Sequence, residues 1–254
     1  MSTPQTQGVL ATQTVSKTYR GREVVREVSL HVTAGEIVGL LGPNGAGKTT
    51  TFYIAVGLIQ PNRGEVLLDG ARVTRMPMHQ RARLGIGYLP QEPSIFRKMT
   101  VAENILAILE TWPYERAVRY KRMEELLQEF NLVPLRQMKG YTLSGGERRR
   151  VELARLLASS PRYALLDEPF TGIDPIMVGE VQNLIFHLKQ KGIGVLITDH
   201  RVRETLEITD RAYIMHEGRI LKSGSPEELI ESSEVKKVYL GESFSLSRGS
   251  LKKM

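Results

Sequence analysis

The segment Gly42-Pro43-Asn44-Gly45-Ala46-Gly47-Lys48-Thr49 constrains the fold of this chain more than any other stretch. It follows an apolar run of strand length, residues 37–41, and opens a helix predicted from about residue 48 to residue 56. The spacing matches G-x-x-x-x-G-K-[ST], in which glycines let backbone N–H groups turn toward phosphate oxygens at a helix N-terminus. A glycine-rich turn without a ligand is the alternative, but the Lys-Thr pair favours a nucleotide. We therefore expect Lys48 to contact the β- and γ-phosphates and Thr49 to ligate Mg²⁺ through its hydroxyl.

Strand and helix patterns alternate along much of the chain, and this alternation predicts an α/β fold with a parallel sheet core. Short buried strands are expected over 86–89, 163–166 and 193–198, with a helix over about 176–191 between the last two. Two regions depart from the alternation. The β-branched residues over 10–32 predict a small antiparallel β region, and the helical pattern over 100–137 predicts a helical subdomain inserted into the core.

Two acidic residues follow the predicted strand 163–166. Asp167 stands at the carboxyl end of this strand, where it can hold the hydration shell of Mg²⁺ across from Thr49. Glu168 comes next and can polarise the attacking water as a general base, an effect worth roughly 10²–10⁴-fold in rate. The alternative is that both acids only cap the turn at Pro169. The phosphate-binding loop makes the catalytic interpretation the stronger one.

Gln91 and His200 also follow predicted strands. A neutral amide such as that of Gln91 can bind Mg²⁺ or water without adding charge, so it can respond to the γ-phosphate. His200 can contact the γ-phosphate from the end of a third parallel strand. Taken alone, a loop glutamine and a single histidine are more often structural. Their positions at strand ends make both of them candidates for the same site.

A second glycine turn, Leu143-Ser144-Gly145-Gly146-Glu147, opens another predicted helix. Its small residues permit close backbone approach, and a helix N-terminus favours anions. Two phosphate sites in one chain are redundant unless each contacts the same ATP from a different copy. This argues for a head-to-tail homodimer with two ATP molecules between two-fold-related copies, in which hydrolysis weakens the interface.

Composition limits the other classes of function. The 254 residues include no cysteine, which excludes disulfides and thiolate metal sites, and no apolar run approaches the ~18 residues that a membrane-spanning helix needs. Residues 1–5 carry neither a basic nor an apolar stretch, so no signal peptide is expected. The net charge of +7 allows nucleic-acid binding or contact with an anionic membrane. The densest basic cluster, Arg148 to Arg150, fans around a predicted helix, so we expect no direct nucleic-acid binding.

Taken together, these motifs resemble the ATP-binding cassette (ABC) family over about residues 8–240. The resemblance implies an α/β P-loop NTPase fold with a RecA-like parallel sheet core, an N-terminal antiparallel β subdomain and an inserted α-helical subdomain. On this basis we expect residues 8–242 to form a single ATP-binding domain, with the helical subdomain at about 92–160, and residues 243–254 to form a flexible C-terminal tail. The cofactors implied are ATP and Mg²⁺, and the activity implied is ATP hydrolysis coupled to transmembrane transport.

The resemblance also implies roles for individual residues. Nucleotide contacts are implied for an adenine-stacking aromatic, the phosphate-binding loop, the signature turn and the D-loop, namely Tyr19, Gly42, Pro43, Asn44, Gly45, Ala46, Gly47, Lys48, Thr49, Thr50, Ser144, Gly145, Gly146 and Asp174. Metal contacts are implied for Thr49, Gln91 and Asp167, and catalytic roles for Glu168, His200 and Gln91. For Tyr19 the alternative is an ordinary strand aromatic. The D-loop, 171–174, departs from the commoner Ser-Ala-Leu-Asp only in the residues beside Asp174.

Several segments, residues 238–242 among them, resemble more narrowly the ATPases of bacterial lipopolysaccharide exporters. This implies a cytoplasmic homodimer, peripheral on the inner membrane and bound to two transmembrane (LptF/LptG-like) subunits, with Phe96 and Arg97 in the groove that receives a coupling helix. Phe96 packed within the helical subdomain is the alternative. Segments 110–119 and 245–254 depart from that pattern. The ATPase of a branched-chain amino acid importer, a soluble nucleic-acid-associated cassette, and a GTPase or small kinase remain open alternatives.

Overall fold

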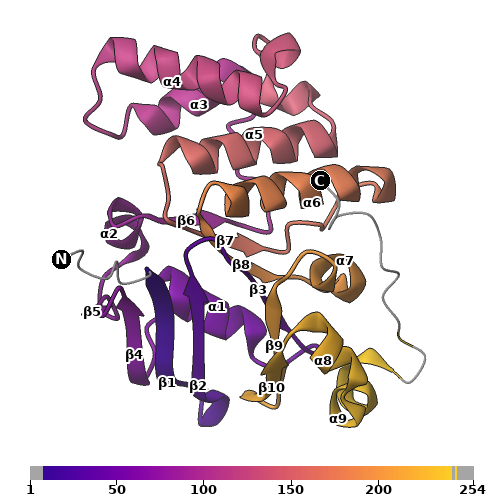
Figure 1. Cartoon of the computed structure of the whole chain (residues 1–254). Helices are drawn as coiled ribbons and strands as arrows, with labels where there is room; N and C mark the ends of the chain where they lie inside the picture. The colour runs from indigo at the N-terminus through magenta and orange to yellow at the C-terminus, as the bar shows by residue number, and fades with distance from the viewer. Residues whose placement is uncertain (1–7, 242–243, 245–254) are drawn as a thin grey trace, which may run out of the picture.

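Two β-sheets and the helices packed around them make up the structure (Figure 1). The computed structural model describes residues 8–241 and residue 244. The predicted C-terminal tail, 243–254, therefore lies outside the described residues except for Phe244. Both sheets and all the helices named below fall within the described range.

The larger sheet has six strands in the order β10-β9-β3-β8-β7-β6. Its parallel strands are β3 (Ile37–Leu41), β6 (Ile86–Leu89), β7 (Tyr163–Asp167), β8 (Gly194–Thr198) and β9 (Arg211–His216), and β10 (Arg219–Gly224) runs antiparallel to β9 at the edge. Every residue of β3, β7 and β8 is buried, as expected for parallel strands covered on both faces. The predicted parallel core is confirmed, and the carboxyl ends of its strands meet along one edge.

The smaller sheet is antiparallel and has the order β2-β1-β4-β5. It consists of β1 (Val9–Tyr19), β2 (Arg22–Thr33), β4 (Arg63–Leu68) and the short β5 (Ala71–Arg72). The antiparallel sheet therefore extends beyond the β region predicted over 10–32, because β4, some 30 residues later in the chain, pairs with β1. Helix α1 (Lys48–Val56) packs between the two sheets, where Phe52 shares a buried cluster with Val28 and Leu40.

A layer of helices covers the other side of the larger sheet, with α3, α4 and α5 stacked beyond α6 in Figure 1. These are α3 (Val101–Leu109), α4 (Arg116–Glu129), α5 (Gly145–Ala158) and α6 (Pro175–Gln190). Helices α3 and α4 lie within the helical pattern predicted over 100–137, and α5 lies within the wider predicted subdomain range of about 92–160. One hydrophobic cluster joins them to α6 and to sheet residues such as Leu89 and Leu166. The helical region therefore shares its core with the α/β body.

The remaining helices are short: α2 (Met78–Arg83), α7 (Val202–Leu206), α8 (Pro226–Glu231) and α9 (Ser233–Val235). Ser225 caps α8, since its hydroxyl accepts the backbone N–H of Glu228. A π-helical turn, Lys236–Leu240, follows α9. A third buried cluster includes Leu41, Leu206 and Leu229. Through this cluster α7 and α8 pack against the end of β3.

Among the helices of the described residues, none combines the length and the hydrophobicity that a membrane span requires.

Candidate functional site

The predicted phosphate-binding loop connects β3 to α1. Lys48 is the first residue of α1, and its Nζ donates to the carbonyl oxygens of Gly42 (2.7 Å) and Pro43 (2.9 Å). The side chain therefore folds back over the loop. Burial lowers the pKa of Lys48, and the negative charge of Glu168 opposes this shift. The partly buried ammonium group of Lys48 therefore interacts electrostatically with Glu168, which follows β7.

The β9–β10 hairpin contacts the phosphate-binding loop on one side. The N–H of Gly218 in the hairpin turn donates to the carbonyl oxygen of Ala46 at 3.0 Å. Gly42 has a φ of 144°, and a Cβ at this position would collide with the carbonyl oxygen of Met215 on β9. Glycine is required here both for its backbone conformation and for this close approach.

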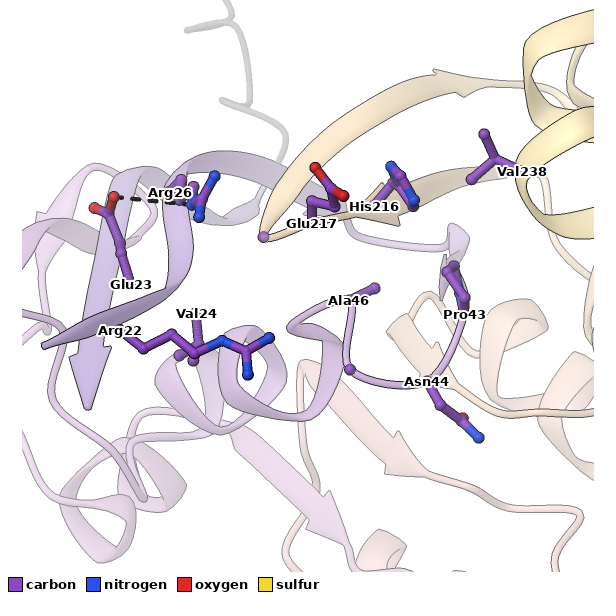
Figure 2. A pocket seen from close by; sticks show the side chains of 12 residues that line it. Arg22, Glu23, Val24, Arg26, Pro43, Asn44, Ala46, His216, Glu217 and Val238 are labelled. Carbon is purple, nitrogen blue, oxygen red and sulfur yellow. Dashed lines mark ion pairs between the residues drawn. The ribbon is translucent and has the colours of Figure 1, made fainter. Parts of the chain in front are cut away.

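A recess of about 540 Å³ opens beside the loop. Figure 2 shows it between the start of β2, the loop and the β9–β10 turn. Arg22 and Arg26 line it on the β2 side, and His216 lines it on the side of the β9–β10 turn. Glu23, which pairs with Arg26, and Glu217 also line the recess, so its charged side chains are of both signs. Tyr19, predicted to stack on adenine, lies at the end of β1 outside the residues that line the recess, and its side chain is 43% exposed.

The predicted catalytic residues Gln91, Glu168 and His200 come together at the carboxyl ends of β6, β7 and β8. Glu168 Oε2 accepts a hydrogen bond from Gln91 Nε2 at 2.8 Å and lies 3.3 Å from His200 Nδ1. The Thr171 hydroxyl donates to the same oxygen at 2.9 Å. Glu168 has a φ of 45° and is one of eight non-glycine residues among the described ones with a left-handed backbone, which L-residues adopt infrequently.

Asp167, at the end of β7, is 2% exposed. Burial raises the pKa of its carboxyl group, and hydrogen bonding from the Tyr53 and Tyr88 side chains acts in the opposite direction. Its Oδ2 is buried and makes no hydrogen bond within the described part of the chain. An unpartnered buried carboxylate oxygen costs free energy unless a ligand completes it. Oxygen is the ligand that Mg²⁺ prefers, so this atom fits the predicted metal.

Asp199 fixes the turn that carries His200. It is 1% exposed, and its two oxygens accept the backbone N–H groups of Phe170 at 3.0 Å and Arg201 at 2.8 Å. Burial raises the pKa of this carboxyl group, and those two N–H groups oppose the shift. The His200 side chain beside it is 58% exposed. A buried acid therefore holds the backbone while the imidazole stays accessible to a ligand.

The basic triplet 148–150 contains a residue whose role its sequence did not reveal. Arg149 is 3% exposed on α5, and its Nη1 lies 3.1 Å from Oε2 of Glu152, which is 4% exposed. Arg149 Nη2 also donates to the carbonyl oxygen of Glu168 at 3.3 Å. The other Glu152 oxygen accepts the N–H of Ser94 at 2.8 Å. This pair ties α5 to the segments that follow β6 and β7. In the sequence, only the i, i+3 spacing of the two opposite charges could have indicated this ion pair.

The predicted signature turn begins α5. The Ser144 hydroxyl accepts the Glu147 N–H at 3.3 Å, and the Glu147 carboxylate accepts the Ser144 N–H at 2.9 Å, which together form a capping box. Gly145 lies close to Gly172 of the predicted D-loop. Asp174 of that loop caps α6 by accepting the Ile176 N–H at 2.9 Å. No hydrogen bond or ion pair among the described residues joins this turn to the phosphate-binding loop.

Phe96 and Arg97, the predicted partner contacts, precede α3. The Phe96 side chain is 44% exposed, and the Arg155 guanidinium lies 4.4 Å from its ring centre. Its backbone is fixed by the Asn104 side chain, which accepts from the Phe96 N–H at 2.8 Å and donates to its carbonyl at 3.0 Å. Arg97 is also exposed. A rigid backbone therefore presents an aromatic ring and a cation side by side at the surface.

Comparison with known proteins is consistent with this site. Residues 25–171 match the family model described as ABC transporter. A lipopolysaccharide export system ATP-binding protein, LptB of Acidithiobacillus ferridurans, is 59% identical over 94% of this chain and 99% of its own length. The same-named protein of Escherichia coli K12 is 52% identical over 93% of this chain and 99% of its own length.

Solved structures give the same result. An ATP-binding cassette of an ABC transporter in its ADP conformation matches with a TM-score of 0.83 and 28% identity, over 93% of this chain and all of that one. A dimeric cassette in a post-hydrolysis state, bound to ADP and phosphate, matches with a TM-score of 0.74 and 25% identity, over 85% and 98%. Sequence and fold therefore agree along nearly the whole chain, which belongs to the ABC transporter family and is one of its ATP-binding, ATP-hydrolysing cassettes.

Proposed function

We propose that this chain is the ATPase subunit of a lipopolysaccharide export transporter. In this proposal it works as a homodimer on the cytoplasmic face of the inner membrane, beneath two transmembrane subunits of the LptF/LptG kind. The observation that carries the proposal is the similarity to the lipopolysaccharide export proteins, which extends over almost the full length of both chains. It therefore includes segments outside the motifs that all cassettes share.

ATP would lie with its phosphates against the loop from Gly42 to Thr49 and the helix N-terminus behind it. Lys48, now bonded to loop carbonyls, would turn its Nζ to the β- and γ-phosphates. The recess beside the loop supports a place for the rest of the nucleotide, and Tyr19, which is not among its lining residues, is the proposed adenine contact. Thr49, Gln91 and Asp167 would hold Mg²⁺, which when bound neutralises charge on the β- and γ-phosphates.

Glu168 is the proposed general base. Its carboxylate would take a proton from the water that attacks the γ-phosphate, as the bond between that phosphorus and the bridging oxygen breaks. The hydrogen bond from Gln91 and the proximity of His200 support this role, because both side chains already orient the same oxygen. Both residues would also contact the γ-phosphate or its water, so they would respond when the phosphate leaves.

A second copy would complete each site. The signature turn, Ser144 to Gly146, presents a helix N-terminus that no hydrogen bond or ion pair among the described residues joins to the loop of its own chain, which supports a role toward the ATP of its partner. Asp174 would contact the same interface. The dimeric cassette bound to ADP and phosphate supports this arrangement by its similarity of fold. ATP would then hold the dimer together, and its hydrolysis would weaken it.

Membrane subunits would engage the exposed pair Phe96 and Arg97. An aromatic ring beside an arginine is a common anchor of protein interfaces. The transported molecule would be selected by those subunits. A branched-chain amino acid importer would use a cassette with the same motifs, and no feature of this site favours it over the lipopolysaccharide exporter.

Substitution of the proposed base tests the catalytic part. Glu168→Gln preserves the shape and an acceptor oxygen, so ATP binding should persist while phosphate release falls roughly 10²–10⁴-fold. With ATP and Mg²⁺, the variant should elute at twice the 28.6 kDa of one chain in size-exclusion chromatography with light scattering. Glu231→Gln, on the exposed end of α8, is the matched control. Wild-type turnover in the Glu168 variant would contradict the assignment of the base.

A further inference from the structure

Tyr19, the proposed adenine contact, is the last residue of β1, and its side chain is 43% exposed. Lys17 lies two residues earlier on the same strand, and its Nζ is positioned over the Tyr19 ring, 5.3 Å from the ring centre. A cation at this distance is attracted to the negative face of an aromatic ring. Lys17 therefore occupies one face of the ring, while the tyrosine side chain keeps an exposed surface for a ligand.

The ammonium group of Lys17 is itself held by a backbone carbonyl. Lys17 Nζ donates to the carbonyl oxygen of Gln60 at 2.7 Å. Beside it, the Thr18 N–H donates to the side-chain oxygen of Asn62 at 2.8 Å, and the Asn62 N–H donates to the Ser16 carbonyl at 2.8 Å. The register between β1 and β2 shifts on both sides of Lys17, so regular strand pairing alone does not fix this end of β1. The bonds to Gln60 and Asn62 supply the missing support.

The segment that carries Gln60 follows α1, the helix that begins in the phosphate-binding loop. The carbonyl oxygen of Tyr53, in the last turn of α1, accepts the backbone N–H groups of residues 57–59 at distances between 3.0 and 3.2 Å. These bonds fold the chain back onto the helix end just before Gln60. Lys48 stands at the other end of α1. The proposed adenine contact is thus connected, through Lys17 and α1, to the proposed phosphate contact.

We propose that Lys17 is a positioning residue for the nucleotide: its ammonium group holds the Tyr19 ring where the ring can stack on adenine. The inference rests on the proposed function, in which Tyr19 contacts the base and the loop contacts the phosphates. Its physical basis is preorganisation, because a side chain that is already held loses less rotamer freedom when a ligand binds. Lys17 acts through Tyr19 and not on the reacting atoms, so its loss should raise the Kd with little change in kcat.

The test compares Lys17→Met with Lys121→Met, which removes the charge of an exposed lysine on α4. Methionine keeps an unbranched apolar side chain and removes the ammonium group. We expect the Kd for ATP·Mg²⁺ to rise about two- to fivefold in Lys17→Met, as the loss of one cation–ring contact predicts, and to stay unchanged in Lys121→Met. Inorganic triphosphate with Mg²⁺ carries no base, so its Kd should be the same in the wild type and in both variants.

Tyr19→Ala separates this inference from the proposed function. It should raise the Kd for ATP, and adding Lys17→Met to it should raise the Kd no further, because Lys17 acts through the ring that is now absent. An additive rise in the double variant, an equal rise for ATP and triphosphate in Lys17→Met, or an unchanged Kd for ATP in Lys17→Met would overturn the inference alone. A wild-type Kd in Tyr19→Ala would refute the proposed adenine contact and the inference with it. Failure of the wild-type chain to bind ATP would refute the proposed function as a whole.

Discussion

Replacement of Arg149 by methionine tests how the signature helix is joined to the catalytic strand ends. Arg149 pairs with the buried Glu152 at 3.1 Å and donates to the carbonyl of Glu168, whose backbone is left-handed. Methionine keeps most of the side-chain volume and removes the charge. Glu152 then remains 4% exposed without its guanidinium partner.

The expected cost follows from this geometry. Removal of one partner of a buried ion pair typically costs about 3–5 kcal/mol, because the remaining charge is left uncompensated. Glu152 retains the hydrogen bond from the Ser94 N–H, so we expect the lower end, about 3 kcal/mol. For a chain of 254 residues, with an unfolding entropy of about 2.1 cal/mol/K per residue, this lowers the melting temperature by roughly 6 °C.

Thermal and urea unfolding of the purified chain measure this cost. Arg148→Met is the matched control, since Arg148 lies on the same helix turn, is less buried and has no ion pair among the described residues. It should cost less than about 1 kcal/mol. Arg149→Met combined with Glu152→Leu should recover much of the loss, because no unpaired charge remains. A loss below about 1 kcal/mol in Arg149→Met, or a double variant no more stable than the single one, would show that the buried ion pair does not hold α5 in this way.

Two other substitutions probe the metal site and the partner surface. Burial raises the pKa of Asp167, so its contribution to stability is present below the ordinary pKa of 3.8 and is lost as pH rises through the raised folded value. Without Mg²⁺, Asp167→Asn should therefore melt above the wild type at pH 7, with a difference that shrinks toward pH 4; an equal or lower melting temperature at pH 7 would contradict the argument. Phe96→Ala removes an exposed ring, so it should shift the melting temperature by less than about 2 °C while recovery of membrane subunits falls about tenfold or more. Undiminished recovery would exclude Phe96 as an anchor.

Much of the fold could be predicted because local patterns and tertiary structure agree. The apolar runs before Gly42 and Asp167 have the composition of strands buried on both faces, and both are parallel strands of the core. Parallel strands bring their carboxyl ends to one edge. Gln91, Glu168 and His200 could therefore be predicted to meet even though more than 100 residues separate the first from the last.

The remaining features depend on contacts that no local pattern records. The burial of Arg149 depends on how α5 packs on the segments after β6 and β7, and its sequence neighbours, also arginines, give the same signal. The left-handed backbone of Glu168 results from the turn that its surroundings impose. The buried cluster that Leu41 and Val235 share requires the C-terminal turn to pack at the base of the loop, and the sequence shows only that both segments exist.

If this cassette drives a lipopolysaccharide exporter, the membrane proteins that it binds should belong to such an exporter. The tagged chain would be expressed in its native cell, extracted from membranes in mild detergent, and its co-purifying proteins identified by mass spectrometry. We expect two transmembrane subunits of a lipopolysaccharide export system, with reduced recovery for Phe96→Ala. Amino acid permease subunits in their place, or no membrane protein at all, would contradict it.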